Sequence, residues 1–114
     1  MGHAILTHHL DAADAAHIVQ RLGLAHCLRG MAQRIEADFR RWPAFDTSAR
    51  VAHHSPVGVI ELMPISDGQA YSFKYVNGHP GNHRVGLPTV MAFGVLADVA
   101  TGVSRYIQAL SARP

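Results

Sequence analysis

Three charged side chains each lie in a predicted strand or at its start, two of them on the arms of one hairpin, and they have the clearest potential for chemistry. Lys74 is the only lysine among ten cationic residues, and Glu61 lies in the apolar run "VGVIELMP". Arg50 directly precedes the weakly alternating stretch "VAHH". Arginine binds carboxylates through a planar fork and lysine through a point charge, so the three residues could form a carboxylate pocket. The alternative is a half-exposed ion pair between Glu61 and Lys74 on facing strands.

Lys74 is followed by the loop "NGHPGNHRVGLP", which holds three glycines and two prolines. Such a loop is typical of plain turns, although its glycines would also let the backbone approach a ligand closely. It does not match a dinucleotide or phosphate fingerprint. The nine histidines show no metal-binding spacing, and Cys27 has no nucleophile context. From these patterns we predict no metal site and assign no catalytic residue.

Two helices and then a sheet are expected to position these residues. Asp11 is a predicted N-cap for a helix that ends at Gly23, and an apolar row at helical spacing predicts a second helix that ends before Pro43. Four strands are then predicted in "ARVAHH", "VGVIELMP", "AYSFKYV" and "TVMAFGVLAD", with "SDG" as a hairpin turn and Pro64 as a strand end. Alternation puts Tyr71, Phe73 and Tyr75 on the face opposite Lys74. A last strand, "VSRYIQAL", would leave its outer edge uncovered.

Size and composition predict one α+β domain spanning residues 1–114, with two N-terminal helices and a mainly antiparallel sheet. The formal charge of +2, without a basic stripe, argues against nucleic acid as a partner. No apolar run is long enough to span a membrane, and the first residues do not resemble a signal peptide. With a single cysteine, a reducing cytoplasm is the expected location.

The strings "SARVA", "GVIELMP", "FKYVNGHP" and "TVMAFGVLADV" together resemble the amino-terminal part of the ornithine cyclodeaminase/mu-crystallin family. The resemblance is dense over residues 41–102 and looser over the two preceding helices. It implies a homodimer built from a substrate and dimerisation domain and a Rossmann domain that binds NAD. The implied reaction converts L-ornithine into L-proline and ammonia through internal hydride transfer with NAD.

The same resemblance assigns roles to residues of this chain. Arg50 and Lys74 would bind the substrate carboxylate. Glu61 and Met63 would line the pocket, with Glu61 meeting an amino group, and Thr89 would contact the cofactor.

After Gly102 the chain departs from the family pattern and reads "VSRYIQALSARP". This departure predicts a truncated or frameshifted chain that carries part of the substrate site and lacks the Rossmann domain. Two alternatives stay open. The first is an inactive fragment or a non-enzymatic module for dimerisation or amino-acid binding, and the second is a relative of the ketimine reductases or amino-acid dehydrogenases.

Overall fold

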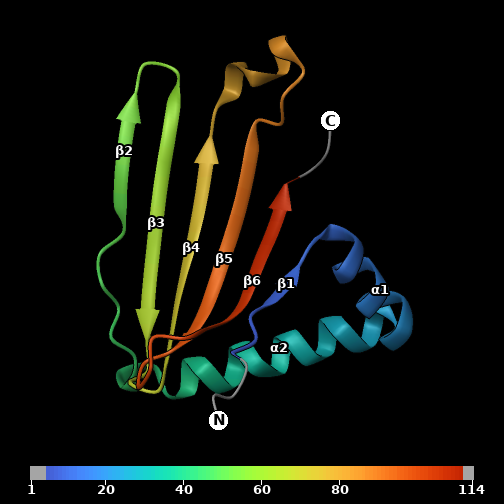
Figure 1. The fold of residues 1–114 in the computed structure, drawn as a ribbon, viewed down its shortest axis with the longest axis vertical. Coiled ribbons are helices and arrows are strands. Elements are labelled where there is room, and N and C mark those ends of the chain that lie inside the picture. Colours follow the sequence, from blue (N-terminus) through green and yellow to red (C-terminus); the bar gives the residue numbers. More distant parts are fainter. Residues whose placement is uncertain (1–4, 112–114) are drawn as a thin grey trace.

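The computed structural model describes residues 5–111, which form two helices and one six-stranded sheet (Figure 1). The elements follow in the order β1 (His8–Leu10), α1 (Ala12–Leu22), α2 (Leu24–Arg40), the 3-10 helix η1 (Trp42–Ala44), β2 (Val51–Ser55), β3 (Gly58–Ser66), β4 (Ala70–Gly78), the 3-10 helix η2 (Pro80–Val85), β5 (Val90–Asp98) and β6 (Ser104–Ser111). The α+β prediction of two helices followed by a mainly antiparallel sheet is therefore confirmed.

Both helices begin and end close to where the sequence predicts. Asp11 caps α1 through a capping box, because its Oδ1 accepts from the backbone N of Asp14 at 2.8 Å and its own N donates to Asp14 Oδ2 at 3.0 Å. Gly23, at φ 85°, separates the two helices. The α-helical part of α2 stops at Arg40, and Pro43 lies inside η1.

The strands lie in the order β1-β6-β5-β4-β3-β2, and all neighbours are antiparallel except β1 and β6. Met63 pairs with Lys74 and Glu61 pairs with Val76. Paired residues share a face, so Glu61, Met63 and Lys74 lie on one face of the sheet. Tyr71, Phe73 and Tyr75 lie on the opposite face, as the alternation predicts. We call these the helix face and the open face, respectively.

Two predictions are wrong, one about the outer edge of the sheet and one about where β3 ends. The outer edge of β6 is covered over residues 106–108, where the three residues of β1 pair with it in parallel. A strand this short, with two histidines, shows no readable alternation. Pro64 does not end β3, which continues to Ser66. The pairing with β2 stops at Leu62, so Pro64 lies where β3 is an edge strand on that side, and proline is tolerated there.

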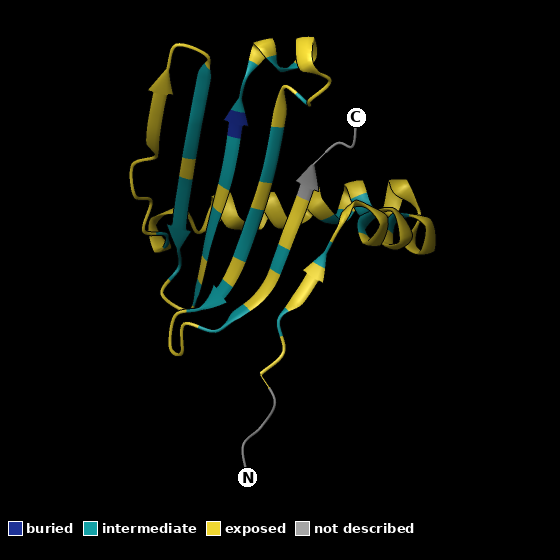
Figure 2. Cartoon of the chain, turned by 45° about the horizontal axis from the view of Figure 1, so that its top comes forward, coloured by how far each residue is buried: buried dark blue, intermediate teal, exposed yellow. Residues whose placement is uncertain are grey.

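Only one residue whose burial is described is buried, and it is polar: Asn77 on β4, 5% exposed (Figure 2). Its Oδ1 accepts from the backbone N of Met91 at 2.6 Å, and its Nδ2 lies 2.6 Å from His79 Nδ1. No apolar side chain between residues 5 and 109 is buried. Asn77 therefore fixes the start of the loop after β4 through hydrogen bonds, while the apolar side chains of both sheet faces stay partly accessible.

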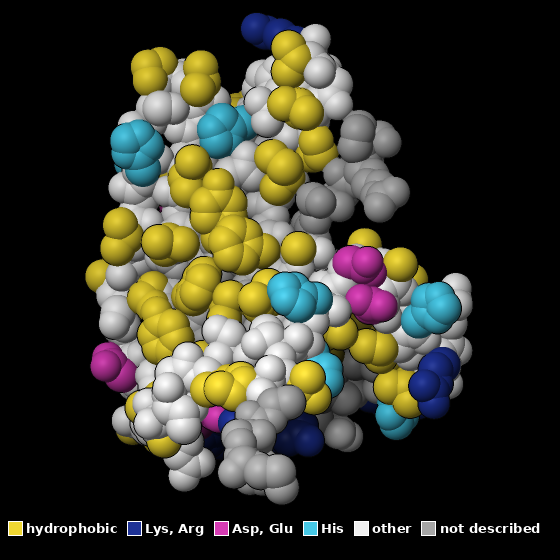
Figure 3. Space-filling model, in the orientation of Figure 1, with side chains coloured by type: hydrophobic (Ala, Val, Ile, Leu, Met, Phe, Trp, Pro, Cys, Tyr) yellow, Lys and Arg dark blue, Asp and Glu magenta, His cyan; other side chains and the backbone are white. Residues whose placement is uncertain are grey.

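Hydrophobic side chains gather on the open face over the middle of the sheet (Figure 3). Aromatic rings form a chain across β4 and β5, with Tyr75 stacked on Phe93 at 4.9 Å between ring centroids and Phe73 edge-on to Phe93 at 6.0 Å. Phe93 keeps 37% of its surface exposed. The helices lie on the other side of the sheet, so they leave the aromatic side chains of the open face accessible (Figure 2).

Candidate functional site

Glu61, Met63 and Lys74 come together on the helix face because β3 and β4 form one hairpin. Met63 lies directly opposite Lys74, and Glu61 lies two residues along β3. The helix α2 crosses the same face nearer the β3–β4 turn, where side chains from helix and sheet line a common cavity. The predicted site therefore lies on the part of the helix face beyond α2.

Arg50 reaches this cluster from the residue before β2 and forms an ion pair with Glu61. Its Nη1 lies 3.0 Å from Glu61 Oε2, and the side chains are 60% and 22% exposed, respectively. The contact uses one guanidinium nitrogen, so Nε and Nη2 make no hydrogen bond to any other described residue. A carboxylate could bind this second edge of the fork without displacing Glu61.

Lys74 has neither an ion pair nor a hydrogen bond within residues 5–111. The expected alternative, a cross-strand pair between Glu61 and Lys74, is therefore not what the structure contains: Glu61 pairs with Arg50 instead. Lys74 is exposed and borders a cavity of about 160 Å³ whose other lining residues are Ser72, Phe73, Ala92, Phe93, Gly94 and Gln108. None of these carries a negative charge, so the ammonium is available to a bound anion.

Thr89 lies apart from the other four predicted site residues. It precedes β5, near Gly78, which pairs with Val90. Five residues of extended chain separate it from Gly94, the partner of Lys74, which corresponds to about 16 Å. Thr89 is exposed, and its carbonyl accepts from His79 N at 2.8 Å. A ligand atom that contacts the Thr89 hydroxyl would therefore be out of reach of the charged cluster.

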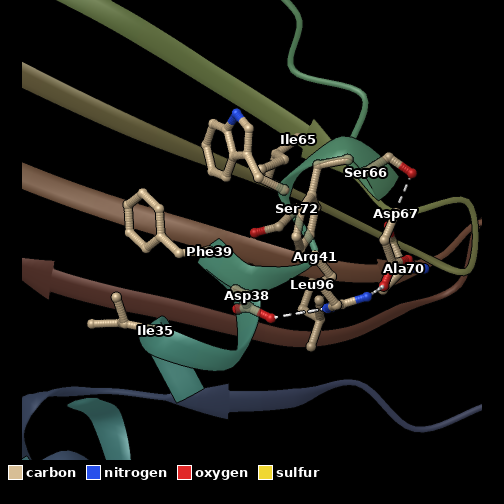
Figure 4. A pocket seen from close by; sticks show the side chains of 12 residues that line it. Ile35, Asp38, Phe39, Arg41, Ile65, Ser66, Asp67, Ala70, Ser72 and Leu96 are labelled. Carbon is tan, nitrogen blue, oxygen red and sulfur yellow. Dashed lines mark hydrogen bonds and ion pairs between the residues drawn. The ribbon is translucent and has the colours of Figure 1, made fainter. Parts of the chain in front are cut away.

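A second cavity, of about 370 Å³, lies beneath the end of α2 and was not foreseen from the sequence (Figure 4). Its apolar walls come from both layers and include Ile35, Phe39, Trp42, Phe45, Ile65 and Leu96. The sequence signal was the apolar row of α2, which predicts a helix facing a sheet but not the space left between them.

Arg41 closes the rim of this second cavity. Its guanidinium donates to Asp38 at 3.2 Å and to Asp67 at 3.1 Å, and it lies 4.5 Å from the ring centroid of Phe45. Backbone N–H groups of Ala70 and Gln69, followed by Arg41, lower the pKa of Asp67 from 3.8 to about 2. The same two carboxylates raise the pKa of Arg41. This network ties α2 to the β3–β4 turn and is structural in character.

The described residues form neither a metal-binding cluster nor a membrane-spanning helix. Between Ile5 and Ser111, no group of three or more His, Cys, Asp or Glu side chains is placed to hold a metal ion. No helix in this part of the chain is long and apolar enough to cross a membrane.

Comparison with known proteins identifies relatives. Residues 13–111 match the profile of the ornithine cyclodeaminase/mu-crystallin family. Over 85 residues the chain is 61% identical to an ornithine cyclodeaminase of Brucella abortus biovar 1 (strain 9-941) and 58% identical to one of Agrobacterium tumefaciens (strain Ach5). Each alignment covers 75% of this chain and 24% of the relative, so the chain spans about a quarter of the length of the curated relatives it matches.

Solved structures agree in fold. A lysine cyclodeaminase, described as recognising L-lysine, L-ornithine and L-2,4-diaminobutyric acid, superposes with a TM-score of 0.75 at 27% identity, over 90% of this chain and 32% of that one. An archaeal alanine dehydrogenase dimer with bound NAD gives a TM-score of 0.67 at 24% identity, over 90% of this chain and 31% of that chain. At that identity the second comparison shows a shared fold alone.

Proposed function

Because this chain belongs to the ornithine cyclodeaminase/mu-crystallin family, we propose that it carries part of the L-ornithine site of an ornithine cyclodeaminase. The reaction would convert L-ornithine into L-proline and ammonia. Curated relatives with that name are 58% to 61% identical to the chain, which supports ornithine over other amino acids. These relatives are about four times longer than the aligned part, so the activity is proposed for the whole protein and not for residues 1–114 by themselves.

The observation that carries the proposal is the Lys74 ammonium without a carboxylate partner, beside the Arg50–Glu61 pair on the same face. Lys74 and the unoccupied edge of Arg50 would bind the substrate carboxylate by charge-assisted hydrogen bonds. Glu61, held in place by Arg50, would accept from an ammonium group of ornithine. Met63, half-buried opposite Lys74, would contact the aliphatic part of the substrate.

NAD is the proposed cofactor, and it would supply the acceptor and donor of the hydride exchanged with the substrate α-carbon. Thr89 is the residue of this chain proposed to contact it, since its side chain is exposed at the start of β5. It is some distance from Lys74, which fits a site where substrate and nucleotide occupy adjoining regions. Most contacts to the nucleotide would have to come from outside the described residues.

A homodimer formed through the open face is also proposed. Monomeric proteins rarely expose a contiguous apolar patch of this kind, and aromatic side chains are enriched at interfaces. The open face exposes large apolar side chains on four neighbouring strands, among them Val51, Leu62, Tyr71 and Phe93. A second copy would present the same patch and bury both.

The test is an NMR titration of the purified chain with L-ornithine, following backbone amides of β3 and β4. We expect saturable shifts near Lys74, and a loss of binding in both Lys74→Met and Arg50→Gln. The matched control is Arg105→Gln, because Arg105 bonds Asp98 at 2.8 Å at the far end of the sheet. Unchanged affinity in both site variants would contradict the assignment. Formation of proline and ammonia by the whole protein, with NAD added, tests the activity separately.

A further inference from the structure

One row of residues crosses three strands of the helix face next to the proposed substrate site. Lys74 on β4 pairs with Gly94 on β5, and Gly94 pairs with Gln108 on β6. The middle position has no side chain, so a gap opens between Lys74 and Gln108. A Cβ at Gly94 would meet only the Phe73 carbonyl, at 3.4 Å, so the backbone does not demand glycine here. Glycine at position 94 therefore leaves open space between the side chains of Lys74 and Gln108.

That space is the cavity of about 160 Å³ described above, and its polar walls are all hydrogen-bond donors or can act as donors. They are the Lys74 ammonium, the Gln108 carboxamide and the Ser72 hydroxyl. None of the three side chains makes a hydrogen bond or ion pair to another residue within 5–111. With no carboxylate in the lining, the cavity favours an anion.

The dimensions suit a carboxylate. Adjacent strands are about 4.8 Å apart, which places Lys74 and Gln108 on backbones about 10 Å from each other. An extended lysine and a glutamine that both lean over the intervening glycine can each approach one oxygen of the same carboxylate at about 2.9 Å. A side chain larger than hydrogen at position 94 would occupy this space.

We propose that Gln108 is a further substrate-binding residue, which donates its amide N–H to the carboxylate that Lys74 holds, with the Ser72 hydroxyl beside it. This inference rests on the proposed function, since it concerns the same substrate group. It adds a residue from β6, a strand that lies within the residues 13–111 matched by the family profile. Gln108 fixes the second carboxylate oxygen, and thereby the orientation of the substrate α-carbon.

The experiment compares Gln108→Leu with Gln33→Leu in the same NMR titration with L-ornithine. Both remove an exposed glutamine amide, but Gln33 lies on α2, away from the cavity. We expect about a tenfold weaker affinity in Gln108→Leu and no change in Gln33→Leu, because a charge-assisted hydrogen bond is lost only in the first. Gln108→Glu should weaken binding further, through repulsion of the carboxylate. In the unaltered chain, the side-chain NH₂ signals of Gln108 should shift with ornithine.

The outcomes separate the two proposals. Binding that depends on Lys74 but is unchanged in Gln108→Leu and Gln108→Glu, with a static Gln108 NH₂ signal, overturns the inference and leaves the proposed function standing. Absence of any ornithine-induced shift in the unaltered chain overturns the proposed function and the inference with it.

Discussion

Arg50 Nη1 lies 3.0 Å from Glu61 Oε2, while Lys74, on the same face, has no carboxylate partner among the described residues. Glu61, the one anion of the cluster, is thus already paired with Arg50. The remaining charge of the cluster is the Lys74 ammonium, which one carboxylate of a ligand would neutralise. The α-carboxylate of an amino acid meets that requirement.

Replacement of Glu61 by Gln tests its role in binding an ammonium group. We expect ornithine affinity to fall about tenfold, because a hydrogen bond from an ammonium to a neutral amide oxygen replaces one to a carboxylate. The free energy of unfolding should change by less than about 1 kcal/mol, since Arg50 is well exposed. Calorimetric titration and urea unfolding measure the two quantities. Asp98→Asn, which alters another ion pair, is the control, and equal affinities in the two variants would argue against this role.

The open face should control self-association. A charge in the middle of this face, as in Phe93→Glu, would have to be buried at the interface, so we expect the chain to become monomeric. Val57→Glu is the matched control, because Val57 lies in the β2–β3 turn and is 69% exposed. Sedimentation velocity measures the result, with circular dichroism to check that both variants fold. A monomeric unaltered chain would contradict the proposed dimer.

Two glycines should respond to alanine in opposite directions. A Cβ at Gly58 would clash with the Gly78 carbonyl oxygen and lie 2.7 Å from the His79 ring, so Gly58→Ala should cost about 1 to 3 kcal/mol of stability. Gly30 is inside α2 with nothing within 4 Å of its Cβ position, so Gly30→Ala should stabilise by up to about 1 kcal/mol. Urea unfolding measures both changes. A loss of stability in Gly30→Ala would contradict the prediction, because it would mean that a Cβ at position 30 meets another part of the protein.

The carboxylate of Asp67 should make stability depend on acid. Its pKa is lowered from 3.8 to about 2 by hydrogen bonds that favour the charged form, so its contribution is present above about pH 4 and is lost as pH falls towards 2. Asp67→Asn removes this titration while keeping a side-chain acceptor. We expect the stability difference between the two proteins to shrink from pH 4 to pH 2 in urea unfolding. A difference that stays constant over that range would contradict the assignment.

Local patterns in the sequence predicted the helices, the hairpin and the two sheet faces, because capping and alternation are read over a few residues. Alternation separates the two faces within each strand, but whether Glu61 and Lys74 share a face depends on the register, which is set by the turn between β3 and β4. The partner of Glu61 was therefore missed, although Arg50 had been singled out. The cavity under Arg41 was missed as well, since it depends on how far α2 lies from the sheet. Neither the partner of Glu61 nor the spacing between α2 and the sheet is encoded in a short window of sequence.

The pairing of β1 with β6 joins the two ends of the described chain. Thr7 donates to the Ser104 carbonyl at 2.7 Å across 97 residues, whereas β3, β4 and β5 pair with neighbours in sequence. Closing so long a loop is entropically costly, and contacts of this kind slow folding. The antiparallel strands can assemble while the chain leaves the ribosome, but β1, made first, must wait for β6. The outer edge of the sheet therefore closes last during synthesis, and until then β6 offers its unpaired backbone to any other strand in reach.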